Sequence, residues 1–392
     1  MKKPRLLLII SLIVFVISVL IMCVDVKKRW ERFVVASATV TKPSLSLYYR
    51  ISDTLDYTKP VGDAIKPFLD LAVQFPQFIK STPTYQKATW VMFETLNNVD
   101  KEMGSMTWPK TVAYIYGVAG SDLLASKSLL AITLTAASLD TLQPLTYITE
   151  NGIGKDKFLA DYEKLKGKSF ILKKNIQRQE GCMITGDLQV VAAAFDPTSG
   201  YVVCQELLQN PLVITEASGI GRKVNVRIYL LVIVSPVVGC TCYMYNDGFM
   251  YYTPSAFVAG SLDAAANITT GYIDRQVYID NPLTFNDLLL KVSTSQASIL
   301  YNNTIAALTN LAAIYKQKFT EANKNIPGIK FNIFGVDIAP ANDYTVKIME
   351  VNKGPDLSYK DDRDELLKKT MVAEMLGIVG ILPRATQNFI TL

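Results

Sequence analysis

Three polar residues near the end of the chain have the types and the spacing to bind a divalent cation. Glu350 and Asn352 alternate in "KIMEVN", so both side chains are expected on one face of a strand, together with Ile348. Asp337 lies between apolar residues of the preceding predicted strand, "GVDIA". If the two strands pair across residues 340–345, two carboxylates and an amide oxygen converge, which suits Mg²⁺. The alternative is a two-stranded ribbon with one solvated face.

Basic residues on two other predicted strands have the placement to bind phosphate groups. In "KVNVRIY", Lys223 and Arg227 share one strand face with Asn225 and Tyr229, and two cations on one face suit nucleotide phosphates. Lys173 lies in the otherwise apolar strand "SFILKKN", where an unpaired charge is costly and a phosphate would serve as its partner. The alternatives are a solvated face for the first set and a strand exit for Lys173.

Composition excludes several other kinds of chemistry. The 392 residues include no histidine, which removes Ser-His-Asp and Cys-His nucleophilic sites, histidine-ligated zinc and a histidine general base. Five cysteines at irregular spacing predict neither a structural zinc nor a disulfide scaffold. The net charge of +5 is mild and basic residues are scattered, so no nucleic-acid partner is expected.

The amino-terminal segment is strongly apolar. Residues 6–24 contain no charge and are flanked by "MKKPR" and "KKRWER". Because about 19 helical residues just cross a bilayer core of about 30 Å, the sequence predicts a retained transmembrane helix rather than a cleaved signal peptide. We therefore expect a single-pass membrane protein with an anchor over residues 1–30. The basic flanks leave its orientation open.

The elements that must position these residues follow from hydrophobic periodicity and turn signals. Helices are predicted at 63–80, 84–103, 121–137, 155–168, within 283–322 and at 364–379. Strands are predicted at 111–119, 144–149, 169–175, 200–208, 221–234 and in two segments of 329–352. Residues 239–253 are predicted as a hairpin turning at Asn246-Asp247-Gly248. The mixture predicts an α+β fold with an α/β region at 31–140 followed by a domain at 141–392.

Four segments follow one another along the chain: "FLADYEKLKGKSFILKK", "VVCQELLQNPLVI", "GRKVNVRIYLLV" and "FGVDIAPANDYTVKIMEVNKGPDLS". In this order they resemble the tubulin–tyrosine ligase-like family, a branch of the ATP-grasp ligases. The resemblance runs from about residue 113 to 380. Each segment keeps its charged position. The resemblance implies an ATP-grasp fold for residues 141–392.

The resemblance also implies a role for each candidate residue. Lys173 would contact ATP phosphates, and Gln205 with Leu207 or Leu208 would border the adenine. The γ-phosphate and the acyl-phosphate formed from it would bind to Lys223 and Arg227, which together with Glu350 are the expected catalytic residues. Mg²⁺ would be held by Asp337, Glu350 and Asn352.

The implied reaction joins an amino acid, with glutamate or tyrosine as candidates, to a protein such as tubulin, using ATP and Mg²⁺. Two departures from the family pattern favour an alternative, a membrane-tethered pseudo-ligase that binds a nucleotide or a partner without turnover. They are Asn225 in place of the family's Asp and a loop poor in glycine at 176–186. Two further departures are "NITTGY" at 267–272, where the family has His-Leu-Thr-Asn-Tyr, and Asp356 in place of Ser. A third hypothesis is an enzyme with another acceptor. ATP chemistry and a tubulin acceptor both favour a cytosolic catalytic domain.

Overall fold

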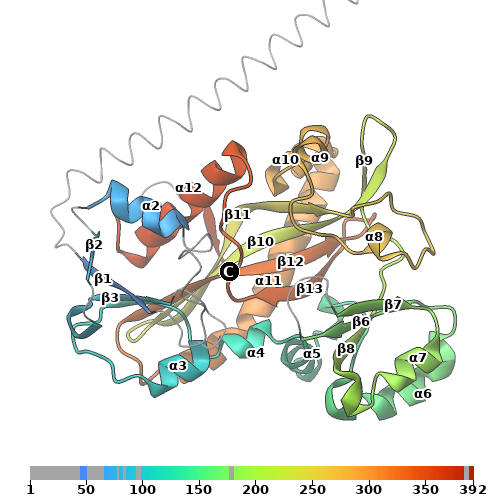
Figure 1. The fold of residues 1–392 in the computed structure, drawn as a ribbon, viewed down its shortest axis with the longest axis horizontal. Helices are drawn as coiled ribbons and strands as arrows, with labels where there is room; N and C mark the ends of the chain where they lie inside the picture. Colours follow the sequence, from blue (N-terminus) through green and yellow to red (C-terminus); the bar gives the residue numbers. More distant parts are fainter. Residues whose placement is uncertain are drawn as a thin grey trace, which may run out of the picture.

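The computed structural model describes residues 45–50, 66–76, 79–82, 85–93, 99–175, 181–383 and 388–392. Two sheets organise this part of the chain, one of ten strands and one of four. Figure 1 shows the long strands of the larger sheet crossing the middle of the molecule, with the smaller sheet and two helices forming a lobe at the lower right. The mixed sheets and helices confirm the predicted α+β class.

The larger sheet is antiparallel in its long central part and parallel at one end. Its order is β14-β11-β10-β12-β4-β3-β1-β2, while β13 also pairs with β12 and β9 with β10. The four long strands are β10 (Gly221–Ser235), β11 (Gly239–Tyr252), β12 (Ile329–Pro340) and β13 (Val346–Asn352). The others are β1 (Leu45–Arg50), β2 (Ile79–Ser81), β3 (Trp90–Phe93), β4 (Tyr114–Tyr116), β9 (Val213–Thr215) and β14 (Phe389–Thr391).

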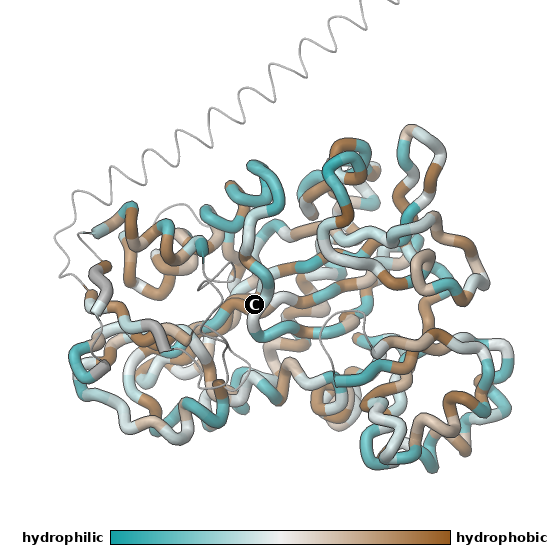
Figure 2. The backbone as a smooth tube through the Cα atoms, viewed as in Figure 1, coloured by the Kyte–Doolittle hydropathy of each residue, from teal (hydrophilic) through white to brown (hydrophobic). Residues whose placement is uncertain are grey.

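Helices cover both faces of this sheet because its strands alternate between two hydrophobic clusters. Val226 and Ile228 of β10 belong to a cluster with Leu308 of α11 (Thr294–Ala322). Tyr229 belongs to the other cluster, with Met371 of α12 (Asp362–Val379). Along parts of the central strands, hydrophobic and hydrophilic residues alternate (Figure 2). The remaining helices near this sheet are α2 (Lys66–Gln74), α3 (Val99–Ser105), α4 (Ser121–Ala125), α5 (Lys127–Ala136), α8 (Ala264–Asn267), α9 (Arg275–Asp280) and α10 (Phe285–Lys291).

The smaller sheet has the order β5-β8-β6-β7 and is antiparallel throughout. Its strands are β5 (Thr146–Ile148), β6 (Phe170–Lys174), β7 (Cys182–Thr185) and β8 (Tyr201–Glu206). A third cluster, which includes Phe158, Phe170 and Val191, joins this sheet to α6 (Lys155–Leu165) and α7 (Leu188–Ala193). The strands and helices predicted between residues 144 and 208 are confirmed, whereas β7 lies in a segment expected to be a loop.

Three local predictions are wrong. The helix predicted at 63–80 ends early, since α2 stops at Gln74 and residues 79–81 form the strand β2. The segment 239–253 is not a hairpin, because β11 runs without reversal and pairs with β10, and the chain turns between these strands at residues 236–238. Asn246 and Asp247 lie instead where the register shifts between Ile228 and Leu230, which makes them a bulge within β11. The predicted helix at 84–103 is also divided, since buried β3 precedes the short helix α3.

The predicted membrane localisation is corrected. Residues 6–24 lie outside the described residues, and no helix in the described part of the chain is long and apolar enough to cross a membrane. The predicted single-pass anchor is therefore not supported, and neither is the predicted localisation of a membrane-anchored chain with a cytosolic catalytic domain. The boundary near residue 140 stays a prediction, although strands of the 31–140 region join the larger sheet through the parallel pairing of β4 with β12.

Candidate active site

Three neighbouring strands bring the predicted cation ligands together with one arginine. Arg227 of β10 lies opposite Asp337 of β12, which in turn lies opposite Glu350 of β13. The Arg227 guanidinium donates from Nε to Asp337 Oδ1 and from Nη2 to Asp337 Oδ2, both at 2.7 Å. Asn352 Nδ2 lies 3.3 Å from Glu350 Oε1 and 3.5 Å from Asp337 Oδ2. Four predicted site residues thus contact one another directly.

A β-bulge in β13 decides which side chains face this cluster. Ile338 pairs with Ile348 and Asp337 pairs with Glu350, so Met349 is an extra residue on β13. As a result Ile348 and Val351, three residues apart, both pack into the same hydrophobic cluster. The prediction that Ile348 shares a face with Glu350 is therefore wrong, although the predicted meeting of Glu350 with Asp337 is observed.

The two carboxyl groups differ in their electrostatic surroundings. Burial raises the pKa of Asp337 to about 6, although the Arg227 guanidinium opposes the shift. Burial acts in the same direction on Glu350, but the positive charges of Lys127, Lys173 and Arg227 outweigh it and lower the pKa of Glu350. Glu350 is therefore ionised at neutral pH and is the more available ligand for a cation.

Lys173 of the smaller sheet faces the same cluster. Its side chain is buried, and its ammonium donates to Gln205 Oε1 at 2.7 Å. Burial lowers its pKa, while the negative charges of Glu350 and Asp337 oppose that shift, so this lysine lies within electrostatic reach of both carboxylates. The two sheets therefore contribute to one site.

Lys223 adds a second buried ammonium. It is only 4 % exposed, and burial together with the positive charge of Lys173 lowers its pKa to about 8. No carboxylate of the described residues lies within ion-pair distance of it. Two buried cations without an acidic partner of their own form a place where an anionic group would be stabilised.

Leu207 lies directly after β8, beside Gln205. Its side chain is buried, and its backbone N–H donates to the Ser169 carbonyl at 2.8 Å. Because the backbone N–H of Leu207 already donates to Ser169, any contact of Leu207 with a ligand would come from its other atoms. Its role at a nucleotide base stays a prediction.

Sequence reasoning missed Lys127, the first residue of α5. Its Nζ lies 3.6 Å from Glu350 Oε2. The sequence held a sign of this contact. A lysine in the first turn of a helix is repelled by the positive end of the helix dipole, so its position there suggests a negatively charged partner nearby. Ser126 caps this helix with its side chain, which fixes where Lys127 leaves the backbone.

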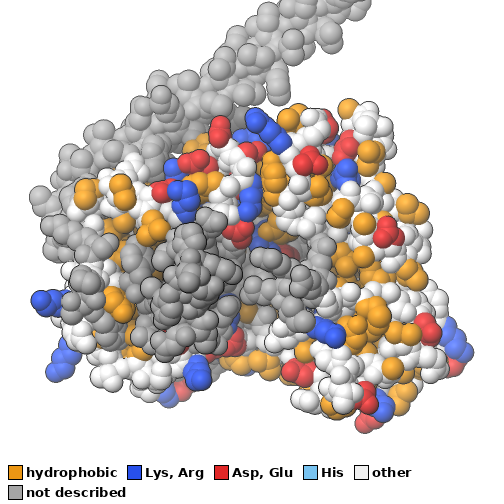
Figure 3. Space-filling view, viewed as in Figure 1, with side chains coloured by type: hydrophobic (Ala, Val, Ile, Leu, Met, Phe, Trp, Pro, Cys, Tyr) orange, Lys and Arg blue, Asp and Glu red, His pale blue; other side chains and the backbone are white. Residues whose placement is uncertain are grey.

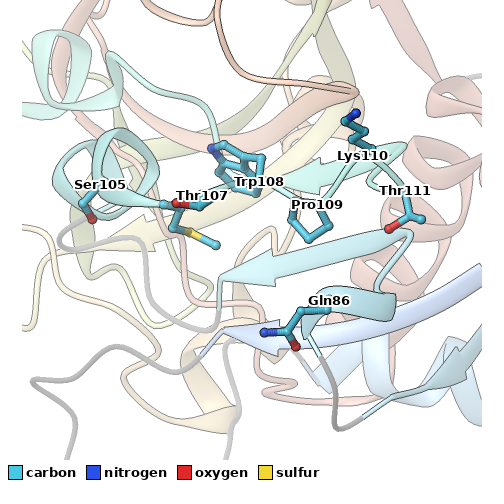
Figure 4. A pocket seen from close by; sticks show the side chains of 8 residues that line it. Gln86, Ser105, Thr107, Trp108, Pro109, Lys110 and Thr111 are labelled. Carbon is cyan, nitrogen blue, oxygen red and sulfur yellow. The ribbon is translucent and has the colours of Figure 1, made fainter.

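Two other surface features do not coincide with this site. An open hollow is lined by Gln86 and residues 105–111, and Figure 4 shows Trp108 and Lys110 around it, but none of the predicted site residues lines it. On the face shown in Figure 3, Lys and Arg side chains are scattered among Asp and Glu.

Among the described residues no group of three or more Cys, Asp or Glu side chains could hold a metal, so the cation ligands proposed above depend on the Asn352 amide.

Comparison with known proteins identifies the family. Residues 123–388, more than half of the chain, match the tubulin-tyrosine ligase family. The chain therefore belongs to the tubulin-tyrosine ligase family, as the sequence motifs predicted. Members of this family are in general ATP-dependent ligases that attach amino acids to proteins.

Individual relatives are more distant. The chain is 24 % identical over 205 residues to the protein named "Probable tubulin polyglutamylase TTLL9" of Mus musculus, which covers 48 % of this chain and 41 % of the relative. The proteins of the same name from Bos taurus and Rattus norvegicus match with the same identity and coverage. The chain thus spans less than half the length of the curated relatives it matches.

Proposed function

We propose that this chain is an ATP- and Mg²⁺-dependent ligase that joins an amino acid to a carboxylate of a protein. The observation that carries the proposal is the buried pair of ammonium groups, Lys173 and Lys223, which act electrostatically on each other. Lys173 is in addition within electrostatic reach of the paired carboxylates Asp337 and Glu350. Cations beside oxygen ligands suit a nucleotide triphosphate with its metal. Tubulin is the first acceptor to test, because the family and the matched relatives carry its name.

The donor set fits Mg²⁺. Asp337 and Glu350 lie opposite each other on paired strands, and the Asn352 amide lies within 3.5 Å of both carboxylates. Rotation of that amide would turn its oxygen toward the same point, giving three oxygen-bearing groups at one place. When bound, Mg²⁺ would neutralise charge on the phosphate oxygens.

Arg227, Lys223 and Lys173 would bind the transferred phosphate group and hold it in line with the acceptor. The acceptor carboxylate attacks the γ-phosphorus, the bond to the bridging oxygen breaks, and ADP leaves. The amine of the amino acid then attacks the acyl-phosphate carbon and loses a proton as inorganic phosphate departs. Because no histidine is available, positioning and charge neutralisation supply the catalysis. Gln205 and Leu207 would border the adenine.

A second candidate is a nucleotide-binding protein without turnover. One observation favours it: Asn225 Oδ1 is buried without a hydrogen-bond partner in the described part of the chain, at a position on the same strand face as Lys223 and Arg227. A carboxylate there would carry a charge that an amide lacks. The loss of that charge leaves binding by the neighbouring cations intact and affects any step that needs a base or a further cation ligand.

Nucleotide binding is tested by calorimetry with ATP in Mg²⁺ and in EDTA. The wild type is expected to bind more tightly in Mg²⁺, and Glu350→Gln is expected to lose that difference while keeping its affinity in EDTA. Glu321→Gln is the matched control, because Glu321 is an exposed acid on α11. Failure of the wild type to bind ATP in either buffer would refute both candidates.

Turnover is tested by incubating the chain with ATP, tubulin and labelled glutamate or tyrosine. The ligase proposal expects ADP release together with transfer of label to protein, and both should depend on Arg227. Binding of ATP with neither ADP release nor label transfer would assign the chain to the second candidate.

A further inference from the structure

We propose that Thr146 is a positioning residue for Lys173, acting through Gln205 to keep the Lys173 ammonium away from Glu350. This inference rests on the proposed function, in which Lys173 binds phosphate and Glu350 holds the metal. It concerns how the protein keeps the Lys173 ammonium and the Glu350 carboxylate apart, so that one is available for phosphate and the other for the metal.

A continuous chain of hydrogen bonds crosses the smaller sheet. Gln205 of β8 pairs with Thr146 of β5 on one side and with Ile171 of β6 on the other. Lys173, two residues beyond Ile171, donates from Nζ to Gln205 Oε1 at 2.7 Å. Gln205 Nε2 donates to Thr146 Oγ1 at 3.1 Å, and Thr146 Oγ1 donates to the Pro144 carbonyl at 2.7 Å.

The chemistry of these groups fixes the direction of the chain. A lysine ammonium only donates, so the oxygen of the Gln205 amide must face Lys173 and the amide nitrogen must face Thr146. The Thr146 hydroxyl can accept that bond because its own proton is directed to the Pro144 carbonyl. Removing the hydroxyl would leave the amide nitrogen without its partner and free the amide to turn.

Glu350 is the competing partner for Lys173. It is the largest favourable electrostatic influence on the Lys173 ammonium, yet the charged atoms of these two described residues are not within ion-pair distance. A buried ammonium that lost Gln205 would move toward this carboxylate, because an unpaired buried charge is costly. That ion pair would occupy a metal ligand and a phosphate-binding cation at once.

The experiment compares Thr146→Val, which lacks the hydroxyl, with Thr146→Ser, which keeps it. Thr149→Val is the matched control, because Thr149 is buried near the same strand and its hydroxyl has no partner in the described residues. The first readout needs no nucleotide: acylation of Lys173 by acetic anhydride, followed by mass spectrometry between pH 7 and 10. The second is the Kd for Mg·ATP.

In Thr146→Val the Lys173 ammonium is expected to pair with Glu350, so its acylation should become at least about three-fold slower at pH 8. The Kd for Mg·ATP should rise roughly three- to ten-fold, the size expected for one lost hydrogen bond. Thr146→Ser and Thr149→Val should behave as wild type. Because Thr146 acts through Gln205, adding Thr146→Val to Gln205→Ala should change neither readout further.

Unchanged acylation of Lys173 in Thr146→Val, or losses that add in the double variant, would overturn the inference. If Thr146→Val does not fold, Thr146→Ala also removes the hydroxyl and takes its place. A wild type that fails to bind Mg·ATP would refute the proposed function, while the acylation rates would still decide whether Thr146 positions Lys173.

Discussion

Arg227 uses two of its nitrogens to bind both oxygens of Asp337, at 2.7 Å each. This contact uses one lone pair of each Asp337 oxygen, and the positive charge of the guanidinium repels a second cation at the same carboxylate. Arg227 and a cation therefore compete for Asp337. A nucleotide phosphate that attracts the arginine would release the carboxylate, so binding of metal and nucleotide should support each other.

This competition predicts the behaviour of Arg227→Gln. Without nucleotide, wild type should gain little thermal stability from Mg²⁺. The variant should be destabilised by about 3 kcal/mol, because Asp337 loses its buried partner, and Mg²⁺ should restore part of that loss. The measurement is the melting temperature of both proteins, without Mg²⁺ and at Mg²⁺ concentrations raised in ten-fold steps. An equal change of melting temperature in both proteins on adding Mg²⁺ would show that Arg227 does not compete with the cation for Asp337.

Lys223 predicts opposite pH dependences for stability and for ligand binding. Burial and Lys173 lower its pKa from 10.5 to about 8 in the folded chain. Between these values the unfolded chain binds more protons, so the free energy of unfolding should rise with pH. Mg·ATP affinity should instead fall above pH 8, since the neutral amine no longer attracts phosphate.

Two variants test this assignment. Lys223→Met should raise the free energy of unfolding at pH 7 by about 1 to 3 kcal/mol, because an uncompensated buried charge is removed. It should also weaken Mg·ATP binding and flatten its decline above pH 8. Lys223→Arg keeps its charge and should retain affinity at pH 9. A decline near pH 8 that persists in both variants would assign it to another group.

A buried ion pair on α12 gives a stability prediction outside the site. Lys368 Nζ lies 2.7 Å from Asp364 Oδ2, and both side chains are at most 4 % exposed. Lys368→Met leaves Asp364 buried without its counter-ion and should lower the free energy of unfolding by about 3 to 5 kcal/mol.

The matched control for that pair is Lys324→Met. Lys324 pairs with Glu321 at the surface, where both side chains are more than half exposed. Its removal should cost less than about 1 kcal/mol. Urea denaturation of the three proteins provides the comparison, and equal losses for the two variants would contradict the role given to burial.

The sequence anticipated which candidate residues lie together better than it anticipated the strands around them. Alternation in "KVNVRIY" placed Lys223 and Arg227 correctly on one face, since β10 pairs regularly with β11 from Val224 to Ile228. The same rule failed for Ile348, because the extra residue Met349 shifts the register and no residue type announces that bulge. The prediction of a hairpin from the turn residues Asn246-Asp247-Gly248 failed for a different reason, since these residues lie at a bulge in a continuous strand.

Contacts between the two sheets were also beyond sequence reasoning. Lys127 reaches Glu350 across more than 200 residues of chain, and Lys173 meets Gln205 only through the register of β6 with β8. Such pairs depend on tertiary packing, which periodicity within one element does not encode. Family motifs supplied Lys173 and Gln205 as separate residues, and the structure adds that they bind each other.

The Arg227 guanidinium lies over the Tyr251 ring, and its edge binds Asp337. The guanidinium carbon lies 4.8 Å from the centre of the Tyr251 ring, while the edge of the guanidinium faces Asp337. The ring therefore limits the tilt of the arginine, and its π face stabilises the positive charge by about 0.5 to 2 kcal/mol. Tyr251→Leu should consequently loosen Arg227 and weaken Mg·ATP binding by up to about ten-fold.

Tyr251→Phe separates the ring from its hydroxyl. The ring alone makes the contact with Arg227, so this variant should bind Mg·ATP as wild type does. Calorimetry with the two variants at pH 7, below the pKa of Lys223, keeps the neighbouring cation charged throughout. If Phe and Leu weaken binding equally, the hydroxyl rather than the ring face is the group that matters, and Arg227 is oriented by Asp337 alone.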